Sequence, residues 1–472
     1  LRNGLGIIGP VDFSRLNKDE YYKMSALTNS TYDGVCYDVR KVAEKLENVE
    51  IHHFDEAWYA YAKFHNLYKD HFAMELTHKL IFASQSTHKL LTAFSQASMI
   101  HVRFPLLQLN KKSETGEVSF HDLFNESYMM HGSTSPQYNM IASLEIATKM
   151  MADNGKVAWN DTIVEAIEMR KKIASIHKEQ TDKGSWFFNM WQPKAIETET
   201  VEELRTNQKH WWINKPDEKN DWHGFDVKET YAMLDPIKLT FLCPGIDVNG
   251  NFKDNEPGIP AAIVTNYLIN QGIVCEKSDY YSWLLLNSLG TTKGKQGGLL
   301  AELFKFKELY DSQALLEDVF PNLTEQYPDA YQGKTLMQHC SEMHAYIRDH
   351  KLLSAMHEAY SNIPKSAMKP SDAYRCIVNK KVESVLLEEL KTATEEKVVA
   401  VMLVPYPPGI PIMMGGEIFS KSGKDNSSPI LDYLTARQNF EQVFPGYESD
   451  IHGIERANID GKSYFKTLII KQ

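Results

Sequence analysis

The chain has 472 residues, of which 43% are hydrophobic and 24% are charged, with 25 Gly and 19 Pro. This is the composition of a folded globular protein, and it excludes collagen-like, low-complexity and wholly disordered chains. With 51 Lys and Arg against 62 Asp and Glu, the formal charge is −11. An acidic chain is not expected to bind nucleic acid or an anionic membrane through its overall charge, and a cationic substrate suits the sign better.

The cysteines and the apolar runs bear on the location of the protein. The five cysteines are widely spaced and form no CxxC pair, so neither a disulfide framework nor a zinc site is expected and a reducing cytoplasm is the simplest location. The histidines near residues 52–71 show no zinc-type spacing, so no metal is expected. No apolar run approaches the roughly 18 residues that cross a bilayer, and no membrane segment is expected.

The first third of the sequence predicts alternating strands and helices. Strands are expected at 49–54, 80–83 and 95–102, and helices at 42–46 and 59–67. Such alternation is typical of a mostly parallel sheet, whose ligands bind beyond the carboxyl ends of the strands. Asp55 and Lys89 come close after two of these strands and are expected near that edge.

The rest of the chain predicts a mixture of helices and strands without an internal repeat. Helices are expected at 141–176, 261–269, 297–310, 336–349 and 382–390, and strands at 237–242 and 283–286. A polar, tryptophan-bearing tract at 192–220 is expected to be irregular, and a Pro-rich turn is expected at 405–411.

Two residues at strand ends suggest a chemistry together that neither indicates alone. Lys89, in the sequence Ser86-Thr87-His88-Lys89, can form a Schiff base, although a solvated loop lysine is the commoner outcome for such a tetrapeptide. Asp55 can pair with the protonated nitrogen of a pyridine ring, although alone it is as easily a helix cap or a surface acid. Spaced 34 residues apart at successive strand ends, they match the Asp-plus-Lys requirement of a pyridoxal phosphate site.

Longer motifs resemble the bacterial fold-type-I, pyridoxal-phosphate-dependent lysine, arginine and ornithine decarboxylases. These motifs are TNSTYDG at 28–34, HFDEAW at 53–58, STHKLLTAFSQASMIHV at 86–102, STSPQY at 133–138, WHGF at 222–225, DPIK at 235–238 and PYPPGIPIMMGGE at 405–417. The resemblance runs from residue 1 almost to residue 472. It implies an α/β fold of the aspartate-aminotransferase type: the remainder of a large cofactor-binding domain with a mainly parallel sheet at 1–152, a small α/β subdomain at 153–313 and a C-terminal α+β domain at 314–472.

The resemblance implies roles for residues around the cofactor. Lys89 would hold pyridoxal 5'-phosphate covalently, and Asp55 would keep the ring nitrogen protonated. Ala57 would pack against the ring face, with Trp58 beside it among the cofactor-binding residues. Lys89 and His88 are the candidate proton donors after carbon dioxide leaves, so Lys89, His88 and Asp55 form the expected catalytic set.

The remaining cofactor contacts imply an assembly. Ser86 and His88 match positions that contact the phosphate and the reacting region. Ser133 and Thr134 match a hydroxyl-rich loop that, in the family, reaches the phosphate from the neighbouring subunit. A homodimer with shared active sites is therefore expected, and a higher assembly such as five dimers is suggested by the resemblance alone.

The substrate is expected to be a basic amino acid. Glu276 matches a position that receives the distal ammonium in the lysine- and ornithine-type enzymes, and a carboxylate suits that cation, although an exposed surface Glu is the alternative. Glu56, the segment 291–295 and Ala359-Tyr360-Ser361 look more like the arginine-type branch. Lysine to cadaverine is narrowly favoured, with arginine to agmatine as the alternative and ornithine less favoured.

Two further interpretations of the function stay open. An aminotransferase on the same fold needs an arginine for the α-carboxylate, and none is apparent. A truncated homologue that acts as a binding partner is the non-catalytic alternative.

The chain starts at Leu1 without an initiator Met, and the family's main phosphate-binding turn and ring-stacking residue have no counterpart in it, so we expect a part of a longer enzyme.

Overall fold

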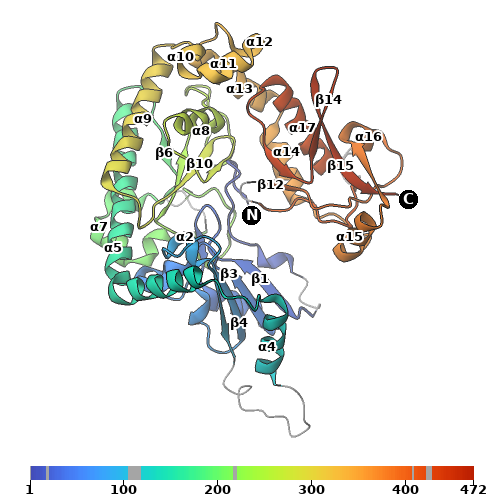
Figure 1. The fold of residues 1–472 in the computed structure, drawn as a ribbon. Coiled ribbons are helices and arrows are strands. Elements are labelled where there is room, and N and C mark those ends of the chain that lie inside the picture. Colours follow the sequence, from blue (N-terminus) through green and yellow to red (C-terminus); the bar gives the residue numbers. More distant parts are fainter. Residues whose placement is uncertain are drawn as a thin grey trace.

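The computed structural model describes residues 2–16, 21–104, 119–215, 221–406, 409–420 and 428–471. Figure 1 shows a first sheet at the bottom, a second sheet above it against the long helix α5, and a C-terminal region on the opposite side from α5. Among these residues, no helix is long and apolar enough to cross a membrane.

The first sheet contains four strands in the order β1-β3-β4-β5. They are β1 Met24–Thr28, β3 Ile51–Asp55, β4 Leu80–Gln85 and β5 Met99–Arg103. The parallel pairing of β3 and β4 agrees with the mostly parallel sheet expected from the sequence. β1, which is not among the expected strands, is parallel to β3, whereas β5 is antiparallel to β4. The segment before β5 holds only the short helix α2, Thr87–Leu90, and after it the chain turns back to pair antiparallel with β4.

The helical segments around this sheet are short. The helix expected at 42–46 is confirmed as α1, Val39–Lys45, and Asp38 caps it by accepting hydrogen bonds from two backbone N–H groups. The helix expected at 59–67 is wrong, because two 3-10 turns occupy this stretch. They are η2 Ala60–Phe64 and η3 Asn66–Tyr68; η1 Phe13–Arg15 and η4 Ala73–Glu75 are similar turns. Residues 59–62 are all buried, and four successive buried residues do not form the single apolar face of an amphipathic helix.

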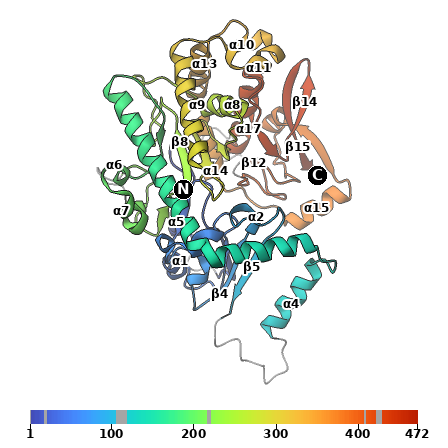
Figure 2. The ribbon, with the colours of Figure 1, turned by 60° about the vertical axis from the view of Figure 1, so that its left-hand side comes forward.

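A helix of 45 residues, α5 Tyr138–Asp182, connects the first sheet to the second. It confirms the helix expected at 141–176 and extends it at both ends. The expected boundary at residue 152 lies inside this helix. Nearby Gly155 packs against Phe64, and a Cβ atom at Gly155 would lie 2.9 Å from the Phe64 ring. The helix α4, Phe120–His131, precedes α5 and packs Phe120 and Phe124 against Phe82 on β4. It is seen beside the first sheet in Figure 2.

The second sheet is antiparallel, with strand order β6-β8-β10-β9. Its strands are β6 Asn189–Met190, β8 Lys238–Leu242, β9 Lys277–Ser278 and β10 Ser282–Leu286. The helices α8 Ala261–Asn270 and α9 Lys293–Asp311 belong to the same region, and they confirm the expected helices there. The tract at 192–220 holds the short α6 Ala195–Thr198, α7 Val201–Thr206 and η5 Gln208–Trp211; its residues 216–220 lie outside the described residues. A two-stranded ladder of β2 Val35–Tyr37 and β7 Ala232–Leu234 joins this region to the first one.

The C-terminal region combines helices with two small sheets, β11-β15-β14 and β12-β13. Its helices are α10 Leu316–Val319, α11 Pro321–Gln326, α12 Pro328–Tyr331, α13 Leu336–Asp349, α14 Leu352–Ser361, α15 Pro370–Val378, α16 Leu387–Thr392 and α17 Pro429–Val443. Its strands are β11 Val382–Leu386, β12 Val404–Tyr406, β13 Asp450–His452, β14 Glu455–Ile459 and β15 Lys462–Ile470. The helix expected at 336–349 is confirmed. Of the expected Pro-rich turn, residues 407 and 408 lie outside the described residues.

The helix expected at 382–390 is wrong in its first half. Residues 382–386 form β11, which pairs with β15 from Val382 opposite Ile470 to Leu386 opposite Lys466. Only the second half is helical, in α16. The partner strand lies about 80 residues further along the chain, so pairing in the tertiary structure overrides the local helical pattern.

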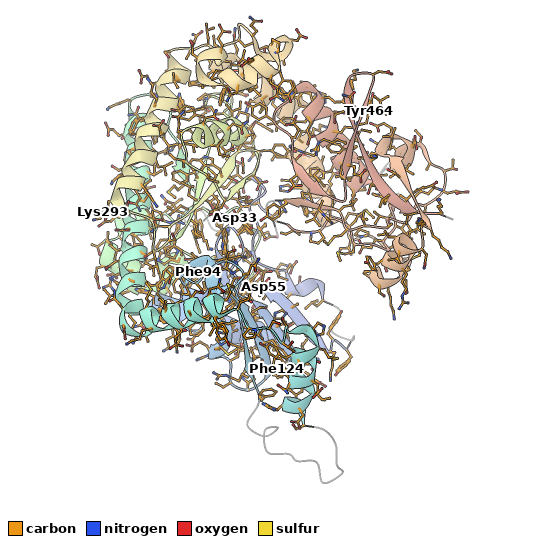
Figure 3. The ribbon with its side chains drawn as sticks, viewed as in Figure 1. Asp33, Asp55, Phe94, Phe124, Lys293 and Tyr464 are labelled. Carbon is orange, nitrogen blue, oxygen red and sulfur yellow. The ribbon has the colours of Figure 1, made fainter. Side chains whose placement is uncertain are left out.

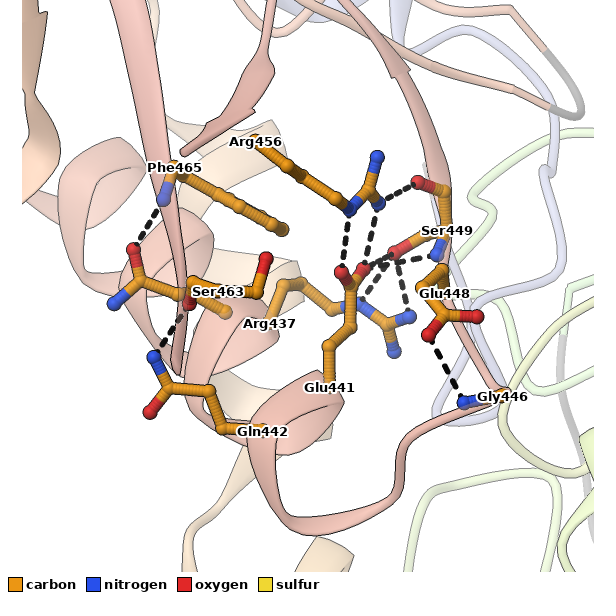
Figure 4. Close-up of polar contacts among 10 residues, drawn as sticks. Arg437, Glu441, Gln442, Gly446, Glu448, Ser449, Arg456, Ser463 and Phe465 are labelled. Atoms are coloured by element: carbon orange, nitrogen blue, oxygen red, sulfur yellow. Dashed lines mark hydrogen bonds and ion pairs between the residues drawn. The ribbon is translucent and has the colours of Figure 1, made fainter. Parts of the chain in front are cut away.

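A buried polar cluster holds the C-terminal region together (Figure 4). Glu441 on α17 is buried and accepts hydrogen bonds from two of the Arg456 side-chain nitrogens, Nε at 3.0 Å and Nη2 at 3.1 Å. It also accepts from the Ser449 hydroxyl at 2.7 Å, and Arg437 donates to the same hydroxyl. The carboxylate is therefore fully partnered, as a buried charge requires.

Candidate active site

The carboxyl edge of the first sheet brings three strand ends together. In the parallel register Thr28, Asp55 and Ser84 lie side by side on β1, β3 and β4. The Asp55 side chain is exposed, and its Oδ1 accepts a hydrogen bond from Ala57 N at 3.1 Å. Figure 3 shows Asp55 at the junction between the first sheet and the part of the chain that carries Asp33. The expected position of Asp55 at this edge is thus observed.

Lys89 lies on α2, directly beyond the neighbouring strand β4. Its side chain is exposed. The adjacent His88 is fixed by two hydrogen bonds to the Ala97 carbonyl, from its backbone N at 3.1 Å and its Nδ1 at 2.7 Å. Because a carbonyl accepts, Nδ1 carries the proton, and Nε2 of a neutral His88 is left as the acceptor.

Two hydroxyl groups beside Lys89 make no hydrogen bond to the described residues. Ser86 is the N-cap residue of α2, but its side chain makes no capping hydrogen bond. The Thr87 hydroxyl is buried and has no hydrogen-bond partner among the described residues. A buried hydroxyl without a partner is costly, so this position suits an added acceptor group.

Glu56 follows Asp55, and its carboxylate connects several strand ends through hydrogen bonds. It is fully buried, and its carboxylate accepts hydrogen bonds from Ala73 N at 2.7 Å, Gln85 Nε2 at 2.8 Å and Asn29 Nδ2 at 3.3 Å. Burial raises the pKa of Glu56 to about 7, although these hydrogen bonds act in the opposite direction. The sequence suggests a link between Glu56 and substrate type; the structure places it in the scaffold instead.

An aromatic wall with a buried cation lies beside Ala57. The Tyr32 and Trp58 rings are 4.6 Å apart between centroids. The Lys238 Nζ lies 3.9 Å from the Trp58 ring centroid and donates to the Trp58 carbonyl at 3.3 Å. Burial lowers the pKa of Lys238 to about 8; nearby Lys89 lowers it too, whereas Asp235 and Glu276 raise it. Ala57 and Trp58 are both half-buried.

The segment that carries Lys238 is anchored from two sides. Asp235 is buried and accepts hydrogen bonds from the hydroxyls of Tyr61 and Tyr68, the second at 2.6 Å. Arg170 on α5 is fully buried and donates to three backbone carbonyls. They are those of Pro236 at 2.9 Å, Trp191 at 3.1 Å and Lys238 at 2.5 Å. Neither Lys238 nor Arg170 has a local sequence pattern that indicates a role in the site, although Lys238 is part of the motif at 235–238.

Glu276 lies directly before β9, with an exposed side chain. Burial, Tyr406 and the charge of Glu276 raise the pKa of Tyr32, and Glu276 also raises the pKa of Lys238. The structure therefore brings Glu276 into the electrostatic range of the aromatic wall, although 187 residues separate it from Lys89.

Ser133 and Thr134 lie in the exposed link between α4 and α5. No hydrogen bond connects either residue to Lys89 or Asp55 in the part of the chain that the structure describes. Large apolar side chains around the link are strongly exposed: Tyr128, Met129, Met130, Tyr138 and Ile141. No group of three or more His, Cys, Asp or Glu residues that could hold a metal occurs among the described residues.

Comparison with known proteins identifies the family. The family model described as "Orn/Lys/Arg decarboxylase, major domain" matches residues 2–295, and "Orn/Lys/Arg decarboxylase, C-terminal domain" matches residues 353–471. The chain belongs to the Orn/Lys/Arg decarboxylase family. The recognition of this family from the sequence motifs is confirmed.

Members of the Orn/Lys/Arg decarboxylase family match along almost the whole chain. A protein of Pseudomonas aeruginosa named lysine decarboxylase LdcA is 42% identical over 98% of this chain and 61% of its own length. The biodegradative arginine decarboxylase of Escherichia coli is 37% identical over 96% of this chain and 62% of its own length. The solved structure of lysine decarboxylase A from P. aeruginosa has a TM-score of 0.87 at 39% identity, covering 100% of this chain and 62% of that one. This likeness confirms the predicted fold class. The chain spans about three-fifths of the length of these relatives.

Proposed function

We propose that this chain forms part of a pyridoxal-phosphate-dependent decarboxylase that converts a basic L-amino acid to its amine and carbon dioxide, with lysine to cadaverine favoured. The observation that carries the proposal is the position of Asp55 and Lys89 at the ends of the adjacent parallel strands β3 and β4. Membership of the Orn/Lys/Arg decarboxylase family supports it.

The residues at this edge fit the cofactor. Lys89 offers an exposed amine for covalent attachment, and the exposed carboxylate of Asp55 can pair with a protonated ring nitrogen. Ala57 leaves room for the ring face. The unengaged Ser86 hydroxyl and the orphan hydroxyl of Thr87 can serve phosphate or substrate oxygens.

The chain's own residues would each do one task in the reaction. When bound, pyridoxal phosphate supplies an electron sink for the bond that breaks as carbon dioxide leaves. Asp55 would hold a proton on the ring nitrogen of the bound cofactor, since a nearby negative charge favours the protonated form. Lys89 or Nε2 of a protonated His88 would then return a proton to the α-carbon. Because the Nδ1 proton is donated to the Ala97 carbonyl, only Nε2 of His88 is available to donate a proton to the substrate.

The substrate is proposed to be bound at its far end by Glu276. A carboxylate there forms a charge-assisted hydrogen bond with a distal ammonium. A P. aeruginosa relative named as a lysine decarboxylase is 42% identical and an E. coli relative named as an arginine decarboxylase is 37% identical, which favours lysine over arginine. The likeness of Glu56 to the arginine-type branch still counts towards arginine, although its buried and partnered carboxylate is not placed to contact a substrate. Arginine to agmatine remains the second candidate, followed by ornithine.

The assembly is proposed to be a homodimer in which Ser133 and Thr134 complete the neighbouring subunit's site. The exposed apolar side chains of α4 and the first turns of α5 support this, because such patches on a soluble surface mark interfaces. A decamer of five dimers is a further proposal. A cytoplasmic location is also proposed, and the five free cysteines support it.

A substrate panel tests the proposal. Purified chain supplemented with pyridoxal phosphate would be incubated with lysine, arginine and ornithine, and the amine and carbon dioxide measured. The proposal predicts cadaverine as the main product and none from Lys89→Ala. Transfer of the amino group to a keto acid would favour an aminotransferase. A protein that binds no cofactor and releases no amine would favour the non-catalytic binding partner.

A further inference from the structure

A fully buried ion pair joins the loop after β1 to strand β9. The Lys277 Nζ lies 2.8 Å and 3.1 Å from the two carboxylate oxygens of Asp33, and 2.7 Å from Asp279 Oδ2. The Lys277 side chain is 2% exposed and that of Asp33 is 1% exposed. Asp33 Oδ2 also accepts from Ile8 N at 3.0 Å, so both charges are well partnered. Figure 3 shows Asp33 above Asp55, at the junction of the two sheets.

Such a pair is poorly explained by stability alone. Removing two charges from water costs about as much as their attraction returns, so apolar residues of similar size are often equally stabilising. A buried pair does, however, fix the relative position of two chain segments, because only one geometry satisfies all of its hydrogen bonds. Here the segments are 244 residues apart in sequence.

Each partner of this pair is the direct neighbour of a residue at the candidate site. Asp33 follows Tyr32, which packs on Trp58, and Lys277 follows Glu276. In an extended segment, successive side chains point to opposite sides. Because Lys277 points into the protein, Glu276 is turned to the exposed side, where its charge acts on Tyr32.

We infer that the Asp33–Lys277 ion pair is a positioning device that sets which length of basic amino acid the site accepts, by holding Glu276 at a fixed place relative to the sheet edge that carries Lys89. The inference rests on the proposed function. A distal ammonium lies a fixed number of bonds from the reacting carbon, so the place of the carboxylate that receives it selects the number of methylene groups. Asp33 and Lys277 are almost fully buried, so we assign them a positioning role and not a catalytic one.

The test compares kcat and KM for lysine with those for ornithine, which is one methylene shorter. In Asp33→Asn the ion pair loses one charge at nearly constant volume. We expect the lysine-to-ornithine ratio of kcat/KM to fall by at least about tenfold, mainly through KM, because Glu276 loses its alignment with the longer substrate. Lys178→Met, which removes an exposed ion pair with Asp182 on α5, is the control and should leave the ratio unchanged.

A double-mutant cycle separates positioning from a general loss of structure. If Asp33 acts through Glu276, then Asp33→Asn should change the ratio no further in a Glu276→Gln background. Equal losses for both substrates, or independent effects of the two substitutions on the ratio, would overturn the inference. Where Asp33→Asn does not fold, as judged by thermal unfolding, Lys277→Arg keeps the charge but changes its geometry, and an unchanged ratio in that variant would likewise overturn it. Wild-type chain that decarboxylates neither amino acid would overturn the proposed function, and this inference with it.

Discussion

Glu56 is the residue whose replacement gives the sharpest physical prediction. Its carboxylate is buried at the carboxyl edge of the first sheet, with donors from Ala73, Gln85 and Asn29. Burial raises its pKa to about 7 from the ordinary value of 4.5. Between these two pH values the native state holds a proton that the unfolded chain releases, so the stability contributed by Glu56 is present at low pH and is lost as the pH rises towards 7.

The size of this effect follows from the two pKa values. Each pH unit between them is worth about 1.4 kcal/mol, so the native state loses about 3 kcal/mol of unfolding free energy from this group between pH 4.5 and 7. Glu56→Gln has nearly the same shape and does not titrate. Gln85 can rotate its amide to offer an oxygen to the new N–H group, although this would change its present contact with His101. The variant should therefore be more stable than the parent at pH 8 and similar to it near pH 5.

Urea unfolding at several pH values measures this directly. The difference in unfolding free energy between Glu56→Gln and the parent should change sharply between pH 5 and 7, because other titrating groups are common to both proteins and cancel. Glu50→Gln, which alters an exposed carboxylate paired with Lys23, is the matched control and should show a small, flat difference. A difference for Glu56→Gln that stays constant from pH 5 to 8 would refute the reasoning.

Two other substitutions have expected results. Arg170→Met should lower the unfolding free energy by at least about 3 kcal/mol in urea, because three buried carbonyls lose their donor. Arg375→Met, which removes an exposed ion pair with Asp372 on α15, should have a small effect; equal effects would contradict the assigned role. Glu276→Gln should raise the KM for lysine about tenfold or more while an uncharged analogue is little affected, and similar changes for both would remove Glu276 from the substrate site.

The residues at the carboxyl edge of the first sheet can be predicted from short stretches of sequence, because each stretch contains both a strand and the polar residues that follow it. The segments that form β3 and β4 show an apolar pattern followed by polar residues, and that pattern places Asp55 and Lys89. β1 is the strand of the parallel set that the pattern does not predict. The register that puts Asp55 beside Ser84 then follows from parallel pairing. Residues 382–386 show the limit, because their strand exists only through pairing with β15.

The parts of the candidate site that escape prediction depend on distant partners. In the sequence, Lys238 is an ordinary charged residue. Only the fold shows that its ammonium group contacts Trp58, which lies 180 residues earlier in the chain. The pairing of Asp33 with Lys277 and the donors around Glu56 are equally non-local. A single sequence gives the residue types at these positions but not the contacts that bury them.

The central claim is that Lys89 carries the cofactor, and borohydride trapping tests it most directly. Protein incubated with pyridoxal phosphate would be reduced with borohydride, digested and analysed by mass spectrometry. The account predicts a pyridoxyl group on the peptide that contains Lys89, with the corresponding loss of visible absorbance. A pyridoxyl group on Lys238 or on another lysine, with Lys89 unmodified, would contradict it.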